Sequence, residues 1–212
     1  TTAAFWVDQR GFDISSNDSA DFQKWFLVAN AKGRYSRGSS ETLLDQDLSV
    51  IRSDGGGQEL LARLKQQVGR LDFSVEELVG RTSRSGAFKT MFLAFRKDDA
   101  RDWSTNLAIS PKHSGAADKI EYHHIFPKAY LRKVRPDVPR ASVDDIANLA
   151  FISGSTNRKI SSKPPSEYRR DYPPAVFDAQ QIDFKGGLDN PDRFEEFSTN
   201  RRRVVAARIN KF

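Results

Sequence analysis

The chain has 212 residues, enough for one large domain or two small ones with a buried core. It contains no cysteine, which excludes disulfide scaffolds, thiolate zinc sites and cysteine nucleophiles. No apolar stretch is long enough to span a bilayer and no signal-peptide core is present, so we expect a soluble, cytoplasmic protein without membrane contact. Because the chain does not begin with methionine, we expect it to be part of a longer protein.

The basic residues are concentrated in the second half of the chain. Lys and Arg number 34 against 28 Asp and Glu, a net charge of +6. Residues 1–118 hold 16 of each sign, so the whole excess lies in residues 119–212. It forms three clusters, at Lys128–Arg140, Arg158–Arg170 and Arg201–Lys211. This pattern favours a polyanionic partner. A solvated basic helix face is the alternative, above all for the last cluster.

Residues 1–100 have the apolar spacing of a helical bundle. A helix is expected from the N-cap Asp18-Ser19 to Gly33, with the apolar stripe Phe22, Trp25, Phe26 and Ala29 facing inward. Further helices are expected over residues 40–54, 58–68 and 88–95, and a capping box at residues 74–77 begins a short one.

The pattern changes after residue 98. Residues 102–118 read as a linker and loop, and residues 119–125 as a strand with Tyr122 in the core, ended by Phe126-Pro127. A short helical turn over 142–147, a strand over 149–152, a helix carrying Asn157, another over 164–168 and a final helix from Asn190 should follow. We therefore expect an α+β fold that is mostly helical: a helical bundle region (1–100), a mixed core (101–189) and a basic C-terminal helix (190–212).

Two of the three histidines are adjacent, at the end of the first expected strand. His123 and His124 could each accept a proton near neutral pH or bind a metal ion, although a hydrogen-bonded core pair is the alternative. Two asparagines follow, Asn148 before the second strand and Asn157 on the next helix. An Asn side chain can bind a cation or orient an imidazole, but Asn148 alone could be a cap. Glu121 is more simply a charge on the strand face.

Three blocks, Glu121–Pro127, Ile146–Ile152 and Ser155–Ile160, resemble in order the His-Asn-His (HNH) nuclease motif, a ββα-metal site. The closer similarity is to the C-terminal domain of GmrSD-type modification-dependent restriction endonucleases. It is carried by Gly33–Ser36, Asp102-Trp103, the His-His-Ile-Phe-Pro block, and the stretch from Ser155 to Tyr168, and it covers roughly residues 5–170.

The resemblance implies a role for each residue. His124 would be the general base that activates water, His123 and Asn157 would bind a divalent metal ion, and Asn148 would hold the loop or the imidazole in place. Four basic residues would bind nucleic acid, although they could also be ordinary surface charges: Lys128, Arg158, Lys159 and Lys163.

Many HNH enzymes have Asp at the position of His123, and this difference affects the expected metal. Imidazole is softer than carboxylate, so Ni²⁺ or Zn²⁺ could bind as well as Mg²⁺ or Mn²⁺. The expected function is a metal-dependent endonuclease that nicks double-stranded DNA, phage DNA above all, in restriction and phage defence. The resemblance also implies a nucleotide-hydrolysing domain or subunit, which we expect outside this chain because no phosphate-binding Gly-rich loop is present. The alternatives are a catalytically degenerate HNH-fold module that binds DNA or a partner, and an RNase.

Overall fold

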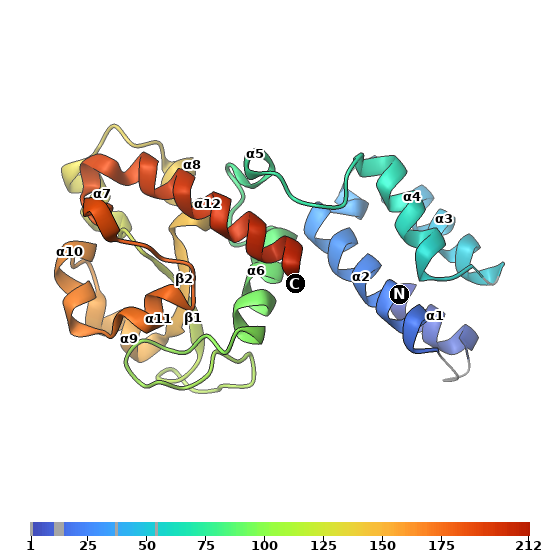
Figure 1. The fold of residues 1–212 in the computed structure, drawn as a ribbon, viewed down its shortest axis with the longest axis horizontal. Coiled ribbons are helices and arrows are strands. Elements are labelled where there is room, and N and C mark those ends of the chain that lie inside the picture. The colour runs from blue at the N-terminus through green and yellow to red at the C-terminus, as the bar shows by residue number, and fades with distance from the viewer. Residues whose placement is uncertain (1, 11–14, 37, 54) are drawn as a thin grey trace. The chain divides into compact units, whose positions relative to one another are not determined.

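The computed structural model describes residues 2–10, 15–36, 38–53 and 55–212 (Figure 1). The described part is mostly helical with one two-stranded antiparallel sheet, which confirms the expected α+β class. It divides into two compact units, residues 1–72 with 85–87, and residues 73–84 with 88–212. The helix over residues 86–97 thus falls mainly in the second unit, whereas the sequence pattern grouped it with the earlier helices. None of the described helices is long and apolar enough to cross a membrane.

The first unit consists of short helices around an aromatic and aliphatic core. Its elements are α1 (Thr2–Arg10), α2 (Ser16–Lys32), the 3-10 turn η1 (Arg34–Ser36), α3 (Ser40–Arg52) and α4 (Gly57–Val68). Gly33 ends α2 in the left-handed conformation, as predicted. The N-cap prediction was wrong, because Ser15 accepts the backbone N–H of Asp18 and α2 begins earlier. Phe26 was also wrongly placed inside, since 45% of it is exposed.

The second unit contains the sheet and the remaining helices. Its α-helices and strands, in chain order, are α5 (Val75–Leu78), α6 (Gly86–Lys97), β1 (Ile120–His124), α7 (Lys128–Val134), α8 (Arg140–Val143), β2 (Leu149–Ser153), α9 (Gly154–Ile160), α10 (Pro165–Tyr168), α11 (Pro174–Asp178) and α12 (Phe194–Lys211). Its 3-10 turns are η2 (Ile146–Asn148), η3 (Arg169–Asp171), η4 (Lys185–Gly187) and η5 (Pro191–Arg193). The expected helical turn over 142–147 is instead split between α8 and η2.

The two strands pair antiparallel, although α7, α8 and η2 lie between them in the chain, and we call this strand pair the hairpin. A different helix packs on each of its faces. In its register Tyr122 lies opposite Phe151, and His123 opposite Ala150. Phe88 and Phe92 of α6 contact the Phe151 ring, with centroid distances of 4.8 and 5.0 Å. Helix α9 packs against both strands.

Tyr122 is not in the core, contrary to the prediction. Its side chain is 51% exposed, although its ring meets the Phe88 ring edge-on. The alternation of residues along a strand identifies two faces, but it does not say how far neighbouring elements cover each face.

Asp102 begins a segment that the sequence analysis treated as a linker, yet it is fully buried. One carboxylate oxygen accepts the backbone N–H of Ser153 at 2.6 Å, and the other accepts the Thr156 hydroxyl at 2.7 Å. The second oxygen also accepts the backbone N–H groups of Ser104 and Thr105, and the Thr105 hydroxyl. Asp102 therefore joins its own loop to the junction of β2 and α9.

Helix α12 buries one apolar face, which consists of Phe194, Phe197, Val205 and Ile209. Its basic residues are not a free basic surface, however. Arg201 is 2% exposed and donates to five backbone carbonyls, those of Ile146, Ala147, Leu149, Gln180 and Gln181. Arg202 pairs with Asp145 at 3.2 Å, and Arg208 pairs with Asp98. Much of the third basic cluster is thus used for folding.

Replacing Arg201 should destabilise the second unit strongly. Burial lowers its pKa to about 9, so the guanidinium is still charged at neutral pH. Arg201→Met would leave several buried carbonyls without a donor, and we expect a loss of about 3 kcal/mol or more in the free energy of unfolding, measured by urea denaturation. The control is Arg203→Met, since Arg203 is exposed on the same helix, and it should change stability by less than about 0.5 kcal/mol. Equal effects of the two substitutions on stability would contradict the stabilising role of the Arg201 hydrogen bonds.

Asp102 should make stability depend on pH. Burial favours a raised pKa, but hydrogen bonds from Ser153, Thr105 and Thr156 hold the pKa of Asp102 below its ordinary value. Because the folded pKa lies below the unfolded one, this stabilisation is present above about pH 4 and is lost as the pH falls through the folded pKa.

Asp102→Asn should therefore cost about 2–4 kcal/mol at pH 7, since an amide cannot accept all of these bonds. The difference from the wild type should shrink below about pH 4, as measured by urea unfolding across a pH series. The control is Asp99→Asn, which should change the free energy of unfolding little because Asp99 is exposed. A difference that stays constant down to pH 2 would show that the Asp102 charge does not matter.

Candidate functional site

His123 lies on β1 and faces α9. Its side chain is 3% exposed, and its Nδ1 is 2.9 Å from the Oδ1 of Asn157. Burial lowers the pKa of His123 to about 4, so the ring is neutral at physiological pH. Its Nε2 is buried and has no hydrogen-bond partner among the described residues, and the rings of Trp103 and Tyr168 lie edge-to-face with the imidazole. A neutral buried imidazole of this kind keeps one nitrogen lone pair for a ligand.

The amide of Asn157 is oriented by Glu121. The Asn157 Nδ2 donates to Glu121 Oε2 at 2.7 Å, so its Oδ1 is turned toward His123. A carboxylate only accepts hydrogen bonds, so it can face the NH₂ group and not the carbonyl. Glu121 is thus more than a charge on the strand face: it sets the direction of the amide oxygen.

The start of α9 is fixed by local chemistry and close packing. Ser153 caps the helix by accepting the backbone N–H of Thr156, as the sequence predicts. A Cβ atom at Gly154 would lie 2.5 Å from the carbonyl oxygen of Ala116, so only glycine fits there. The backbone N–H groups of Gly154 and Ser155 donate to Lys119 and Ala117, which draws the loop before β1 onto the helix. Asn157 is therefore held in place one turn into α9.

His124, the next residue on β1, contacts a different partner. Its Nε2 lies 3.2 Å from Asp144 Oδ1, and the Nζ of Lys128 lies 2.5 Å from the same oxygen. Burial and the nearby Lys128 charge lower the pKa of His124, while Asp144 opposes this shift. The imidazole is 15% exposed, so it is accessible but held by a carboxylate.

Asn148 holds the backbone and not an imidazole. It is fully buried; its Oδ1 accepts the backbone N–H of Phe126 at 2.8 Å, and its Nδ2 donates to the carbonyls of Phe126 and Val143 at 3.1 and 3.0 Å. Its own carbonyl accepts the backbone N–H of Ile125. Asn148 thus fixes the turn directly after His124. Of the two roles considered for it, holding the loop and holding the imidazole, its contacts are those of the first.

One hollow brings most of the expected site residues together. We call it the histidine hollow; its walls are Tyr122, His123, His124, Pro127, Lys128, Ala129, Asn157, Arg158, Ser161 and Ser162. It contains both adjacent histidines, the helix asparagine and two of the four expected nucleic-acid-binding residues. Asn148, Lys159 and Lys163 do not line it.

The other expected basic residues lie outside the histidine hollow. Lys159 donates to the hydroxyl of Ser104 at 2.9 Å, and Lys163 is 3.9 Å from Glu167 and 4.0 Å from Asp171. Arg158, which does line it, is exposed and donates to the carbonyl of Ala116 at 3.1 Å.

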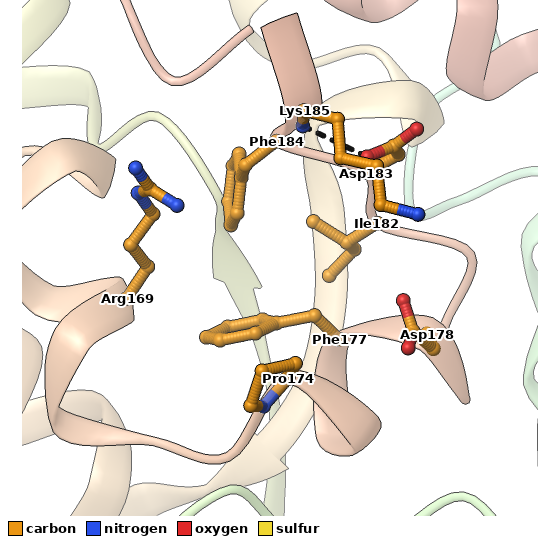
Figure 2. Close-up of a pocket in the computed structure, with 8 residues that line it drawn as sticks. All are labelled: Arg169, Pro174, Phe177, Asp178, Ile182, Asp183, Phe184 and Lys185. Carbon is orange, nitrogen blue, oxygen red and sulfur yellow. Dashed lines mark hydrogen bonds between the residues drawn. The ribbon is translucent and has the colours of Figure 1, made fainter. Parts of the chain in front are cut away.

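A different pocket, shown in Figure 2, contains none of the expected residues. The rings of Phe177 and Phe184 line it, and the Arg169 side chain stands across from them. Arg169 forms an ion pair with Asp189 at 2.7 Å. Because the histidine hollow contains the expected histidines and Asn157 and this pocket contains none of the expected residues, the histidine hollow is the candidate site.

Sequence reasoning missed three acidic residues, Glu121, Asp144 and Asp102, which orient or support site residues. Asp144 stands 20 positions from His124, and Asp102 stands 51 positions from Ser153. Asp144 belongs to no local motif, and although the Asp102-Trp103 pair is part of the family resemblance, no role was predicted for Asp102. The only local signal was Glu121, two residues before His123 on the same face of the strand.

Comparison with known proteins identifies the family. Residues 70–206 match the model for the C-terminal domain of GmrSD restriction endonucleases. The match extends into α12 as far as residue 206 and leaves out the Gly33–Ser36 stretch. The chain is also 29% identical over 162 residues to an uncharacterized protein of Methanocaldococcus jannaschii, covering 74% of this chain and 25% of that protein. The chain spans about a quarter of the length of this curated relative. Since the family match covers more than half of its residues, the chain belongs to the family of C-terminal domains of GmrSD restriction endonucleases.

Proposed function

We propose that this chain is a metal-dependent HNH-type DNA endonuclease whose elementary act is a nick in one strand. The observation that carries the proposal is the meeting of His123, His124 and Asn157 in the histidine hollow, beside Lys128 and Arg158. The hairpin followed by α9 supports a ββα site, in which a pair of strands and a helix supply the functional groups. One such site faces one phosphodiester, so a double-strand break would need two sites or two events.

In the proposed reaction His124 is the general base. Its imidazole takes a proton from water, and the water oxygen forms a bond to phosphorus. The bond from phosphorus to the 3′ oxygen breaks, and the 3′ oxygen leaves with the bonding electrons and takes a proton from solvent. The lowered pKa of His124 leaves the ring unprotonated at neutral pH, as a base must be before it acts. Base catalysis of this kind contributes about 10²–10⁴-fold to a rate.

The residues present fit a divalent cation held by His123 and Asn157. The ring nitrogen and the amide oxygen are 2.9 Å apart, and two adjacent ligands each about 2.1 Å from one cation lie about 3 Å apart. The neutral ring also suits a metal ligand, with Nδ1 as the nitrogen that binds and Nε2 carrying the proton. When bound, the cation would stabilise negative charge on the phosphate.

The donor set favours a cation that keeps part of its water shell. The described residues contain no group of three or more His, Cys, Asp or Glu suited to a metal ion. Water and phosphate oxygens would therefore complete the coordination, as is usual for Mg²⁺ and accessible to Mn²⁺. The imidazole ligand also admits Ni²⁺ or Zn²⁺.

The charges around the hollow support a phosphate-bearing substrate. Lys128 is 38% exposed and Arg158 is exposed, so both can reach a backbone phosphate. We propose Lys159 and Lys163 as more distant phosphate contacts, because Lys159 lies on α9, Lys163 follows this helix, and both are exposed. Double-stranded DNA, including phage DNA in the cytoplasm, is the proposed substrate, and a nucleotide-hydrolysing domain or subunit outside this chain is the proposed partner.

A supercoiled plasmid tests the proposal. With Mg²⁺ or Mn²⁺ it should be converted to the open circle, and EDTA should stop the reaction. His124→Ala should lower the rate at least about 100-fold, because the base is lost. His113→Ala is the matched control. This third histidine is hydrogen-bonded to the Ala108 carbonyl and does not line the histidine hollow, so the substitution should leave the rate unchanged.

Two outcomes would contradict the proposal. The first is plasmid and phage DNA left intact with each of the four metals. The second is binding of DNA by wild type and His124→Ala alike without cleavage by either, which would support a binding module.

A further inference from the structure

The carboxylate of Asp144 contacts three side chains, those of His124, Lys128 and Arg140. It follows α8, and its Oδ1 lies 3.2 Å from His124 Nε2 and 2.5 Å from Lys128 Nζ. Its Oδ2 lies 3.5 Å from the Nε of Arg140, which is otherwise largely exposed. The carboxylate therefore meets the end of β1 and the first residue of α7 at once.

The contact with Asp144 determines which nitrogen of His124 carries the proton. Burial favours a raised pKa, but the hydrogen bonds from Lys128 and His124 hold the pKa of Asp144 below its ordinary value, so the group is ionised. An ionised carboxylate only accepts hydrogen bonds, so the His124 Nε2 must be the donor. In a neutral ring the other nitrogen, Nδ1, then has the free lone pair.

We propose that Asp144 is a positioning residue that holds His124 as the Nε2–H tautomer, with Nδ1 ready to accept the proton of the attacking water. This inference rests on the proposed function. In the reaction an O–H bond of water breaks, the proton moves to Nδ1 and the oxygen bonds to phosphorus. The bond from phosphorus to the 3′ oxygen breaks, and the 3′ oxygen leaves with the bonding electrons and takes a proton from solvent water. Asp144 keeps its charge throughout and stabilises the imidazolium that forms.

The neighbouring residue, Asp145, shows what a purely structural carboxylate looks like in the same segment. It is 1% exposed and accepts the backbone N–H groups of Gly80 and Ala147 at 2.7 and 2.8 Å, and it pairs with Arg202. None of these three partners is a histidine. Asp144, by contrast, is partly exposed and contacts two residues of the histidine hollow. The pair provides a matched comparison between positioning and folding roles.

The direct test is the tautomer of His124 by ¹⁵N NMR of the imidazole nitrogens, in the metal-free protein. The wild type should show protonated Nε2 and unprotonated Nδ1. Asp144→Ala should give a mixture of the two tautomers, and Asp144→Asn should retain Nε2–H because its amide oxygen still accepts. His113→Ala assists assignment of the three histidine spectra.

Cleavage of supercoiled plasmid provides the second readout. Asp144→Ala should lower kcat about 10- to 100-fold without raising KM, the size seen when a supporting carboxylate is lost, and Asp144→Asn should lie between it and the wild type. Asp137→Ala, an exposed carboxylate paired with Arg135, is the control that leaves kcat unchanged. Asp145→Asn should lower the melting temperature without changing the tautomer of His124.

Each result decides the proposal. A wild-type Nδ1–H tautomer, a tautomer unchanged in Asp144→Ala, or a shifted tautomer with undiminished kcat would overturn it. If Asp144→Ala does not fold, Asp144→Asn decides by the same comparison: unchanged kcat overturns the proposal, and lowered kcat with retained Nε2–H supports it. Because the tautomer is read without DNA or metal, a protein that has the expected tautomer but cuts no DNA would refute the proposed function and not the contact.

Discussion

The side chain of Asn157 is the link on which the candidate site depends. Its amide nitrogen donates to Glu121 and its amide oxygen faces His123, so one side chain on α9 contacts two residues on the same face of β1. Neither contact exists within the hairpin alone or the helix alone. The distance between imidazole and amide oxygen is therefore set by how α9 packs on the strand, and the proposed ligand pair exists only because that packing is fixed.

Two buried polar side chains keep this packing in place from opposite ends of the hairpin. Asp102 accepts from Ser153 and Thr156, where β2 becomes α9, and Asn148 fixes the turn at Phe126 directly after His124. Each forms hydrogen bonds both with near neighbours and with groups far away in the sequence. A buried polar group that is fully satisfied specifies one arrangement of the backbone, because any shift would leave several bonds unmade. Preorganised side chains of this kind are what a catalytic site requires.

The structure brings His123, His124 and Asn157, which the sequence singled out, into one hollow, but the side chains that support them were not identified from the sequence. His123, His124 and Asn157 were recognisable from adjacent residue types and from the order of three blocks, and the hairpin and the capped start of α9 followed from local patterns. The roles of Asp144 and Asp102 could not be found that way, because their partners stand 20 and 51 positions away. The Asp102-Trp103 pair contributed to the resemblance, but nothing local indicated what the Asp102 carboxylate binds. The wrong predictions have a related cause. Tyr122 and Arg201 were judged by strand alternation and by charge, but exposure depends on which other elements pack there, and these leave Tyr122 exposed and bury Arg201.

The most direct measurement of the central claim is anomalous diffraction from crystals of this chain grown with Mn²⁺. The account predicts a single strong peak within bonding distance of the His123 ring and the Asn157 amide oxygen, and its loss in the Asn157→Ala variant. An ion bound elsewhere in a protein that still cuts DNA, or an intact hydrogen bond from His123 to Asn157 at saturating Mn²⁺, would contradict it.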